Sequence, residues 1–320
     1  MSTAFQQPGR FYKGNVHGHS TNSDGDLTPE QVVEEYRGRG YDFISLTDHF
    51  MPEPLYQTWL KDWTLGISDT SSLRSADFTT IIGAEIHAPS LVNGELWHIV
   101  AVGLPLDFAP ISAEEQGLDI ARRAYEAGAF VGIAHPAWYS LTIDETLPFL
   151  PYAHAIEVYN TGCELGGRAD SWYFADELFT RGYRLNAFAT DDSHHIHPNG
   201  AYQDAFGGWI QVKSESLEPD ALLAAMKAGH YYASTGPEIE DLTWDGETLT
   251  IRTSPVDHYY ISGIGARADY KAGGNLTEAT FQIPEKAWSG LPWGDYVRIT
   301  ATDANGKKAW SQPIWRTVVE

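Results

Sequence analysis

The sequence predicts an α/β protein with a large N-terminal domain of alternating strands and helices, followed by a smaller β domain. From about residue 12 to residue 236, short apolar runs alternate with helical stretches, which is typical of parallel strands joined by crossover helices. After Ser234-Thr235-Gly236-Pro237 the pattern changes to alternating strands and turns. Single hydrophobic cores stop growing at about 250–300 residues. Because the chain has 320 residues, we expect two domains, residues 1–237 and 238–320.

The first strand is expected to end in the pair His17 and His19. In an extended segment alternate side chains share a face, so both imidazoles can reach one cation. Thr28-Pro29-Glu30-Gln31 then combines a cap, a proline at N1 and an acid in the first turn, which predicts a helix from residue 29 to Gly40. The pair therefore lies at the carboxyl end of a strand, where α/β proteins build their sites. Taken alone, an ordinary cross-strand histidine pair is the alternative.

The other elements of the first domain follow from apolar runs that stop at polar residues and from helical stretches that stop at glycine or arginine. Residues 50–76 are rich in aromatics and are expected to form a long irregular loop over a pocket. The expected strands are residues 41–49, 78–86, 97–103, 130–136, 155–160, 185–195 and 209–213, and the further helices are residues 113–128, 170–181 and 219–229.

Strand ends in this domain repeatedly carry His, Asp or Glu. Ten of the 12 histidines precede residue 200. In a closed parallel barrel the carboxyl ends of all strands meet at one mouth, where several imidazoles and carboxylates are unfavourable to bury unless cations compensate them. The imidazoles expected at this mouth are His17, His19, His49, His98, His135 and His194. Nitrogen and oxygen ligands suit Zn, Mn or Fe, and residue type does not choose among them.

The C-terminal region is expected to be a small β-sandwich that stabilises the first domain or shapes its pocket. Its expected strands are residues 249–252, 259–261, 279–283 and 296–302. Asp245-Gly246 and Asn305-Gly306 are strong signals for tight turns.

Charge and composition exclude several classes of function. The 21 basic and 43 acidic residues give a formal net charge of −22, which disfavours a nucleic-acid backbone, a proofreading role with DNA, or an anionic membrane as partner. Cys163 is the only cysteine, so an intrachain disulfide and a thiolate zinc cluster are excluded. No apolar run approaches the roughly 18–20 residues of a membrane span. We expect a cytoplasmic protein acting on a small-molecule substrate, with its oligomeric state left open.

The ordered motifs closely resemble those of the PHP (polymerase and histidinol phosphatase) superfamily of metallohydrolases. These motifs are His-x-His, Ser-Asp-Gly, Thr-Asp-His, Gly-x-Glu, a strand histidine, Ala-His-Pro and Asp-x-His. Residues 156–165 and 189–194, Ser234-Thr235-Gly236-Pro237 and the C-terminal β region look like the CehA/McbA group within it. The resemblance covers most of residues 12–320 and implies a distorted (β/α)7 barrel that holds two to three divalent metal ions.

The resemblance also implies a ligand set, carried over by matching motif. His17, His19, Glu85 and Asp192 would hold one ion, with Glu85 bridging to a second ion held by His98 and His135. Asp24, His49 and His194 would hold a third ion. Asp191 is the rival to Asp192, which we prefer because it keeps the Asp-x-His spacing.

Two ions about 3.5–4 Å apart would lower the pKa of a shared water and polarise the bond it attacks. No serine or cysteine nucleophile is then needed. Glu85, Asp192 and His194 are the expected catalytic residues, and Asp48 is expected either to orient His49, to move protons or to be an ordinary turn acid. His87 either lines the site or faces away, His195 and His197 are expected at the rim or surface, and Glu157 either binds metal or supports a ligand.

Substrate contacts are expected in the loops after the strands. The candidates are Tyr139, Asn160 and Arg168, with Trp138 and the aromatics Tyr56, Trp59 and Trp63 as walls. The Arg168 guanidinium would take a phosphate or carboxylate in a fork, unless it is a solvated arginine in a first helical turn.

Three functions are compatible with these motifs. The first is a metal-dependent phosphoesterase acting on a small phosphomonoester or phosphodiester, favoured by three metals. The second is a carbamate, ester or amide hydrolase, favoured by the scarcity of Lys and Arg near the predicted mouth. The third is a non-catalytic metal-binding or carbohydrate-binding module, which is disfavoured because every expected ligand is present.

Overall fold

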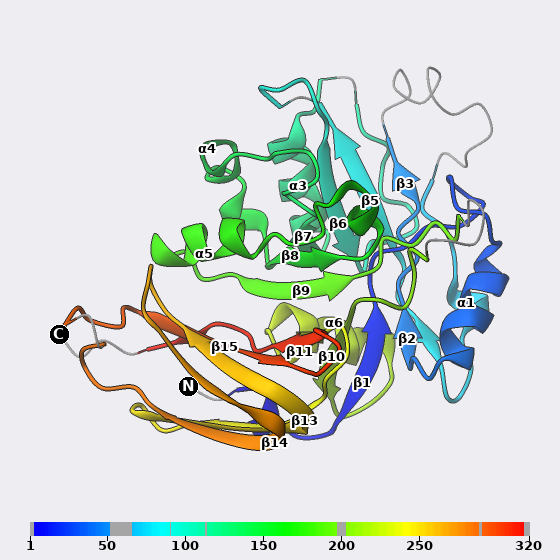
Figure 1. Cartoon of the computed structure of the whole chain (residues 1–320). Helices are drawn as coiled ribbons and strands as arrows, with labels where there is room; N and C mark the ends of the chain where they lie inside the picture. The colour runs from blue at the N-terminus through cyan, green and yellow to red at the C-terminus, as the bar shows by residue number, and fades with distance from the viewer. Residues whose placement is uncertain are drawn as a thin grey trace.

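The computed structural model describes residues 3–51, 66–89, 91–112, 114–196, 203–287 and 290–316, and it confirms a mixed α/β architecture. Its strands form two hydrogen-bonded sheets of 11 and six strands (Figure 1). A single closed sheet is not found among these residues, so the barrel remains a prediction.

The six-stranded sheet carries most of the predicted strand-end residues. Its order is β3 (His49–Phe50), β5 (Gly83–Ala88), β6 (Trp97–Val102), β7 (Phe130–Ile133), β8 (Ala155–Asn160) and β9 (Asn186–Thr190). β6 is antiparallel to both β5 and β7, whereas the other pairs are parallel. The prediction of parallel strands throughout is therefore wrong for β6, because the connection from β5 is too short for a crossover. It is also wrong for the strand Trp209–Ser214, which pairs antiparallel with the strand Arg10–Asn15 of the other sheet. The reversal places His98, near the start of β6, directly opposite His87 of β5.

The larger sheet contains the N-terminal strand in its interior. One part of it contains β1 (Arg10–Asn15), β2 (Phe43–Ile44), β4 (Thr79–Thr80), β10 (Trp209–Ser214) and β11 (Tyr231–Ser234). The predicted strand 41–49 is divided into β2 and β3, and the predicted strand 78–86 into β4 and β5, so each run passes from one sheet to the other. Within each of these two runs the chain therefore crosses from the larger sheet to the smaller one, close to the predicted site.

The C-terminal strands continue the larger sheet. They are β12 (Ile239–Trp244), β13 (Thr248–Ser262), β14 (Ala268–Gln282), β15 (Tyr296–Thr302), β16 (Lys308–Trp310) and β17 (Ile314–Trp315). β16 pairs with both β11 and β15, which joins the sequence on either side of residue 237 into one sheet. The C-terminal region is thus β-rich, as predicted, while a separate sandwich domain from residue 238 stays a prediction. Its own core includes Leu249, Tyr259 and Phe281.

Helices cover the sheets through their apolar faces. The α-helices are α1 (Pro29–Gly38), α3 (Gly117–Glu126), α4 (Ile143–Thr146), α5 (Trp172–Thr180) and α6 (Pro219–Lys227), and the 3-10 helices are η1 (Ala4–Gln6), η2 (Ser71–Leu73), η3 (Leu150–Tyr152) and η4 (Gly162–Gly166). α1 starts where predicted, because Thr28 Oγ1 accepts a hydrogen bond from the N–H of Gln31. α3 and α5 bury Ile120 and Phe179 in the core that contains the six-stranded sheet. Among the described helices, none is long and apolar enough to cross a membrane.

One ion pair fastens the C-terminal strands to α5. Arg298 on β15 donates to Asp176 on α5 through Nη2 at 2.6 Å and Nε at 2.9 Å, and its guanidinium lies 4.0 Å from the ring centre of Trp172. The Arg298 side chain is only 10% exposed. Charge-assisted bonds in such a partly buried position are among the stronger hydrogen bonds of proteins.

Replacing this arginine tests the attachment. We expect Arg298→Met to lower the free energy of unfolding by about 2 kcal/mol, because two charge-assisted hydrogen bonds are lost. The matched control is Arg37→Met, whose partner Asp77 lies 2.7 Å away while both side chains are at least half exposed. Urea unfolding followed by far-UV circular dichroism measures both. Equal effects of the two substitutions would contradict this role for Arg298.

Candidate metal centre

Backbone hydrogen bonds bring the two predicted ligand segments together. The N–H of Asp192 donates to the carbonyl of His17 at 2.9 Å, and the N–H of His19 donates to the carbonyl of Ser193 at 2.8 Å. Gly18 and Ser193 form a parallel bridge, and a Cβ at Gly18 would lie only 2.8 Å from Ser193 Oγ. Asp192 has a φ of 54°, a left-handed conformation that is unusual for a residue with a side chain. The His-x-His and Asp-x-His segments are thus held side by side over about 175 intervening residues.

Glu85 on β5 lies at the centre of the site, with its carboxylate buried. Six imidazoles have a nitrogen within 3.7 Å of its oxygens: His98 at 2.8 Å, His135 at 3.2 Å and His17 at 3.6 Å from Oε1, and His49 at 2.7 Å, His87 at 3.2 Å and His19 at 3.7 Å from Oε2. Burial by itself would raise the pKa of Glu85, but the imidazoles hold that pKa well below its usual range.

Asp192 and Asp191 face in opposite directions. Asp192 Oδ1 lies 2.9 Å from His19 Nε2 and 3.3 Å from His17 Nε2, so its carboxylate belongs to the imidazole cluster. Asp191 instead accepts six hydrogen bonds at 2.7–2.8 Å, from the Asn15 amide, the Tyr36 and Thr161 hydroxyls and the N–H groups of residues 206–208. The Asp-x-His spacing therefore identified the residue that faces the cluster.

The carboxylate of Asp24 pairs with two imidazoles on one side of the cluster. Its Oδ1 lies 3.4 Å from both His49 Nε2 and His194 Nε2. Burial alone would lower the pKa of each imidazole, but the carboxylates beside them, Glu85 and Asp24 for His49 and Asp24 and Asp192 for His194, raise these values to about 10 and about 9. The same contacts hold the pKa of Asp24 below its usual range against the effect of burial.

Divalent cations fit this arrangement. His17 Nε2 and Asp24 Oδ1 are buried and have no hydrogen-bond partner within the described parts of the chain. Five groups of described side chains have ligand atoms within 4.8 Å of one another, and three of them are His17, His19, Glu85 and Asp192; Glu85, His98 and His135; and His19, Asp24, His49 and His194. These groups contain the three sets implied by the sequence resemblance, with His19 also close to the third.

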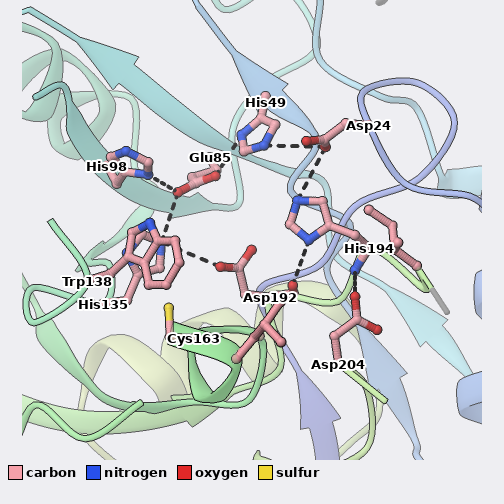
Figure 2. A pocket seen from close by; sticks show the side chains of 13 residues that line it. Asp24, His49, Glu85, His98, His135, Trp138, Cys163, Asp192, His194 and Asp204 are labelled. Atoms are coloured by element: carbon pink, nitrogen blue, oxygen red, sulfur yellow. Dashed lines mark hydrogen bonds and ion pairs between the residues drawn. The ribbon is translucent and has the colours of Figure 1, made fainter. Parts of the chain in front are cut away.

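A cavity of about 370 Å³ lies beside the cluster (Figure 2). Its lining outside the predicted ligands comprises Trp138, Gly162, Cys163, Leu165, Ile196 and Asp204. Trp138, Leu165 and Ile196 are large apolar side chains that are 43%, 71% and 43% exposed. Of the residues described, no Lys or Arg lines this cavity. Leu165, Ile196 and Asp204 were missed at the sequence level, because single residues in a short 3-10 helix or in loops carry no periodic signal.

Among the predicted substrate contacts that the structure describes, Trp138 lines the cavity, whereas Tyr139, Asn160 and Arg168 do not. Arg168 Nη1 donates to the carbonyls of Ala137 and Trp138 at 3.2 Å and 3.1 Å, so this guanidinium fixes the loop that carries Trp138. Tyr139 is buried and stacks on His98, with ring centres 4.9 Å apart. Asn160 is buried and donates to Asp192 Oδ2 at 3.2 Å. Trp138 lines the cavity, whereas Tyr56, Trp59 and Trp63 lie outside the described residues.

Asp48 and Arg168 share a structural role, since both anchor loops. The Asp48 carboxylate accepts hydrogen bonds from the backbone and hydroxyl of Ser20 and from the hydroxyls of Ser23 and Ser68. These bonds hold the turn that presents Asp24. Ordering this turn accounts for the burial of Asp48, and its catalytic role stays a prediction.

The remaining histidines were only partly placed by the sequence. His87 faces the cluster, with Nε2 2.7 Å from His49 Nδ1, as its alternation with Glu85 along β5 allows. The expectation that His195 lies at the rim or surface is wrong, because it is 3% exposed and its ring centre lies 6.1 Å from that of Tyr36. Its φ of 56° turns the chain and directs the side chain inward. His197 lies outside the described residues.

Comparison with known proteins identifies the fold. No family model matches the sequence, and no curated protein matches it. A two-domain protein from Bacteroides vulgatus ATCC 8482, containing a predicted PHP-like metal-dependent phosphoesterase, is 19% identical with a TM-score of 0.52, covering 97% of this chain and 98% of that chain. An amidohydrolase from Chromobacterium violaceum with bound sulfate is 16% identical with a TM-score of 0.41, covering 59% of this chain and 89% of that chain. The similarity to the Bacteroides protein shows that the chain has a PHP-like fold, while the CehA/McbA subgroup remains a prediction.

Cation binding is expected to release protons. With pKa values raised to about 10 and about 9, His49 and His194 are protonated at pH 7 in the metal-free protein. Ligation requires neutral imidazoles, so affinity should rise with pH up to about pH 10 and fall at lower pH. Calorimetric titration with Zn²⁺ at pH 7 in buffers of different ionisation enthalpy measures the released protons. A heat independent of the buffer would contradict this protonation state, and His49→Gln should reduce the release.

The hydrogen bonds of Asp191 predict a large effect on stability. Asp191→Asn puts an NH2 group against N–H and O–H donors, so we expect a loss of about 3 kcal/mol in the free energy of unfolding. The number of cations bound at saturation should not change, because the described partners of Asp191 are not imidazoles. Asp107→Asn, at an exposed position, should change stability by less than about 0.5 kcal/mol. Urea unfolding and elemental analysis provide the two readouts, and wild-type stability in Asp191→Asn would contradict the role.

Proposed function

We propose that the chain is a metal-dependent hydrolase that acts on phosphoesters of small molecules, either phosphomonoesters or phosphodiesters. The observation that carries this proposal is the convergence of Glu85 and Asp192 with the imidazoles beside an open cavity. Two buried ligand atoms, His17 Nε2 and Asp24 Oδ1, make no hydrogen bond in the described structure. Their neighbours at 3.3–3.4 Å, Asp192 for His17 and His49 and His194 for Asp24, are themselves proposed ligands, as expected of atoms that gather around cations.

Two to three Zn, Mn or Fe ions are the cofactors of this proposal. His17, His19, Glu85 and Asp192 would hold one, Glu85, His98 and His135 a second, and Asp24, His49 and His194 a third. Such ions lower the pKa of a coordinated water and polarise the bond under attack. Glu85, which belongs to two of these sets, and Asp192 and His194, which each belong to one, remain the proposed catalytic residues.

The protein side chains prepare this chemistry by their protonation. Burial, reinforced by neighbouring imidazoles, lowers the pKa of His19 to about 4, so its lone pair is available at neutral pH. Burial likewise raises the pKa of the Cys163 thiol, which keeps it protonated and argues against a cysteine nucleophile. Asn160 is proposed to steady Asp192, and Trp138 to form a wall for the substrate.

The fold comparison supports this proposal. The Bacteroides protein, which contains a predicted PHP-like metal-dependent phosphoesterase, aligns with 97% of this chain. At 19% identity this similarity shows a shared fold only. Site residues are therefore argued from the geometry of this chain.

A carbamate or ester hydrolase is the second candidate, and the lining of the cavity favours it. Trp138, Leu165 and Ile196 present apolar surface, and no described Lys or Arg lines the cavity to pair with a doubly charged phosphate. An uncharged acyl group with an apolar leaving group would suit these walls.

Parallel assays test the proposal and separate the candidates. With Mn²⁺ or Zn²⁺ supplied, we expect turnover of p-nitrophenyl phosphate or bis-p-nitrophenyl phosphate, whereas turnover of a naphthyl carbamate alone would favour the second candidate. His17→Ala combined with His19→Ala should lower kcat/KM more than about 100-fold, since even residues behind metal ligands contribute 10–100-fold. His258→Ala, on β13, is the control. Absence of phosphoester turnover with every metal would exclude the first candidate.

A further inference from the structure

Glu157 is a buried carboxylate on β8 that the proposed ligand sets leave unused. Its Oε1 accepts from His17 Nδ1 at 3.1 Å and from the Thr190 hydroxyl. Its Oε2 accepts from the backbone N–H of His135 at 2.7 Å and from Asn160 Nδ2 at 3.2 Å. Glu157 has 0% exposure, so these donors must compensate its charge. They come from β8 itself, from β9 and from the segments that follow β1 and β7.

The hydrogen bond to His17 fixes which ring nitrogen can bind a cation. An ionised carboxylate only accepts hydrogen bonds, so Nδ1 of His17 must carry the proton. In the neutral imidazole that ligation requires, the lone pair then lies at Nε2. This atom is 3.3 Å from Asp192 Oδ1 and 3.6 Å from Glu85 Oε1, and among the described residues it has no hydrogen-bond partner. The ring is therefore held with its free lone pair toward the other ligands.

Direct metal binding by Glu157 is the rival explanation, because His17, His135 and Glu157 also offer atoms within 4.8 Å of one another. However, Glu157 contacts His17 at Nδ1, on the side of the ring away from Asp192 and Glu85. His135 Nε2 lies 3.2 Å from Glu85 Oε1. To bind a cation, Glu157 would have to give up hydrogen bonds that both of its oxygens already accept.

Asn160 extends the influence of Glu157 to a second ligand. Its Nδ2 lies 3.2 Å from both Glu157 Oε2 and Asp192 Oδ2, and its Oδ1 accepts from the N–H of Cys163 at 2.9 Å. The amide therefore joins two carboxylates that would otherwise repel each other. This places Asn160 between the acids and explains why it is buried.

We propose that Glu157 is a positioning residue of the metal centre, which holds His17 with Nε2 directed at the first cation and holds Asp192 through Asn160. The inference rests on the proposed function for the presence of cations. A carboxylate that accepts from the far nitrogen of a ligating histidine fixes the ring and raises its basicity.

The substitution Glu157→Gln tests this role with little change in size. The amide keeps one acceptor but turns an NH2 group toward existing donors. We expect the affinity for the first Co²⁺ to fall about 10–100-fold, with the same number of cations bound at saturation. The visible Co²⁺ spectrum at saturation should match wild type, because the ligands are unchanged. Chelator-treated full-length protein, titrated with Co²⁺ and analysed for bound metal, gives all three readouts.

The control is Glu164→Gln, an exposed acid in η4 whose carboxylate contacts the Tyr159 hydroxyl. It should bind Co²⁺ with wild-type affinity. Wild-type affinity in Glu157→Gln would overturn the inference. Loss of one cation at saturation, or an altered Co²⁺ spectrum, would also overturn it by making Glu157 a ligand.

Nitrogen-15 NMR of the zinc-loaded wild-type protein tests the same point if Glu157→Gln does not fold. His17 should show a protonated Nδ1 and a zinc-bound Nε2, and ligation through Nδ1 would overturn the inference. None of these measurements needs turnover. A wild-type protein that binds Co²⁺ but hydrolyses no test ester would therefore remove the proposed hydrolase and leave the inference standing, whereas failure to bind any cation would remove both.

Discussion

Glu85 places a carboxylate at 1% exposure, where an isolated charge is strongly unfavourable. The surrounding imidazoles make this position possible, since six of them have a nitrogen within 3.7 Å of its oxygens. Much of the nearby structure serves this arrangement. Asp48 orders the turn that carries Asp24, Asp191 fixes the segment before Asp192, and Glu157 contacts His17 and His135.

The cluster could be predicted because its members stand at regular positions relative to strands. Alternation predicted that His17 and His19 reach one site, and both approach Glu85. Asp192 and His194 also line the cavity, but the left-handed backbone of Asp192 means that strand alternation does not explain their direction. The same rule places His87 beside Glu85, although sequence alone left its direction open. The mixed α/β composition and the β-rich C-terminal region also followed from the apolar patterns.

The remaining features depend on tertiary contacts that leave no local pattern. Strand direction depends on the pairing partner, so the reversal of β6 was not predicted. The apolar runs 41–49 and 78–86 look continuous, although each passes between two sheets. The sequence suggested that Arg168 binds an anion, but its Nη1 donates hydrogen bonds to the carbonyls of Ala137 and Trp138. Burial of His195 depends on a left-handed backbone conformation that its residue type does not announce.

The division of strands between two sheets gives the ligand cluster a mechanical meaning. His17 and His19 follow β1 of the larger sheet, whereas Glu85 and Asp192 belong to or follow strands of the smaller one. A cation bound by these four side chains would link the two sheets to each other. Cation binding would then stabilise the whole fold, since a ligand that binds only the native state favours it by mass action. The supply of metal would thereby set the free energy of unfolding of the chain.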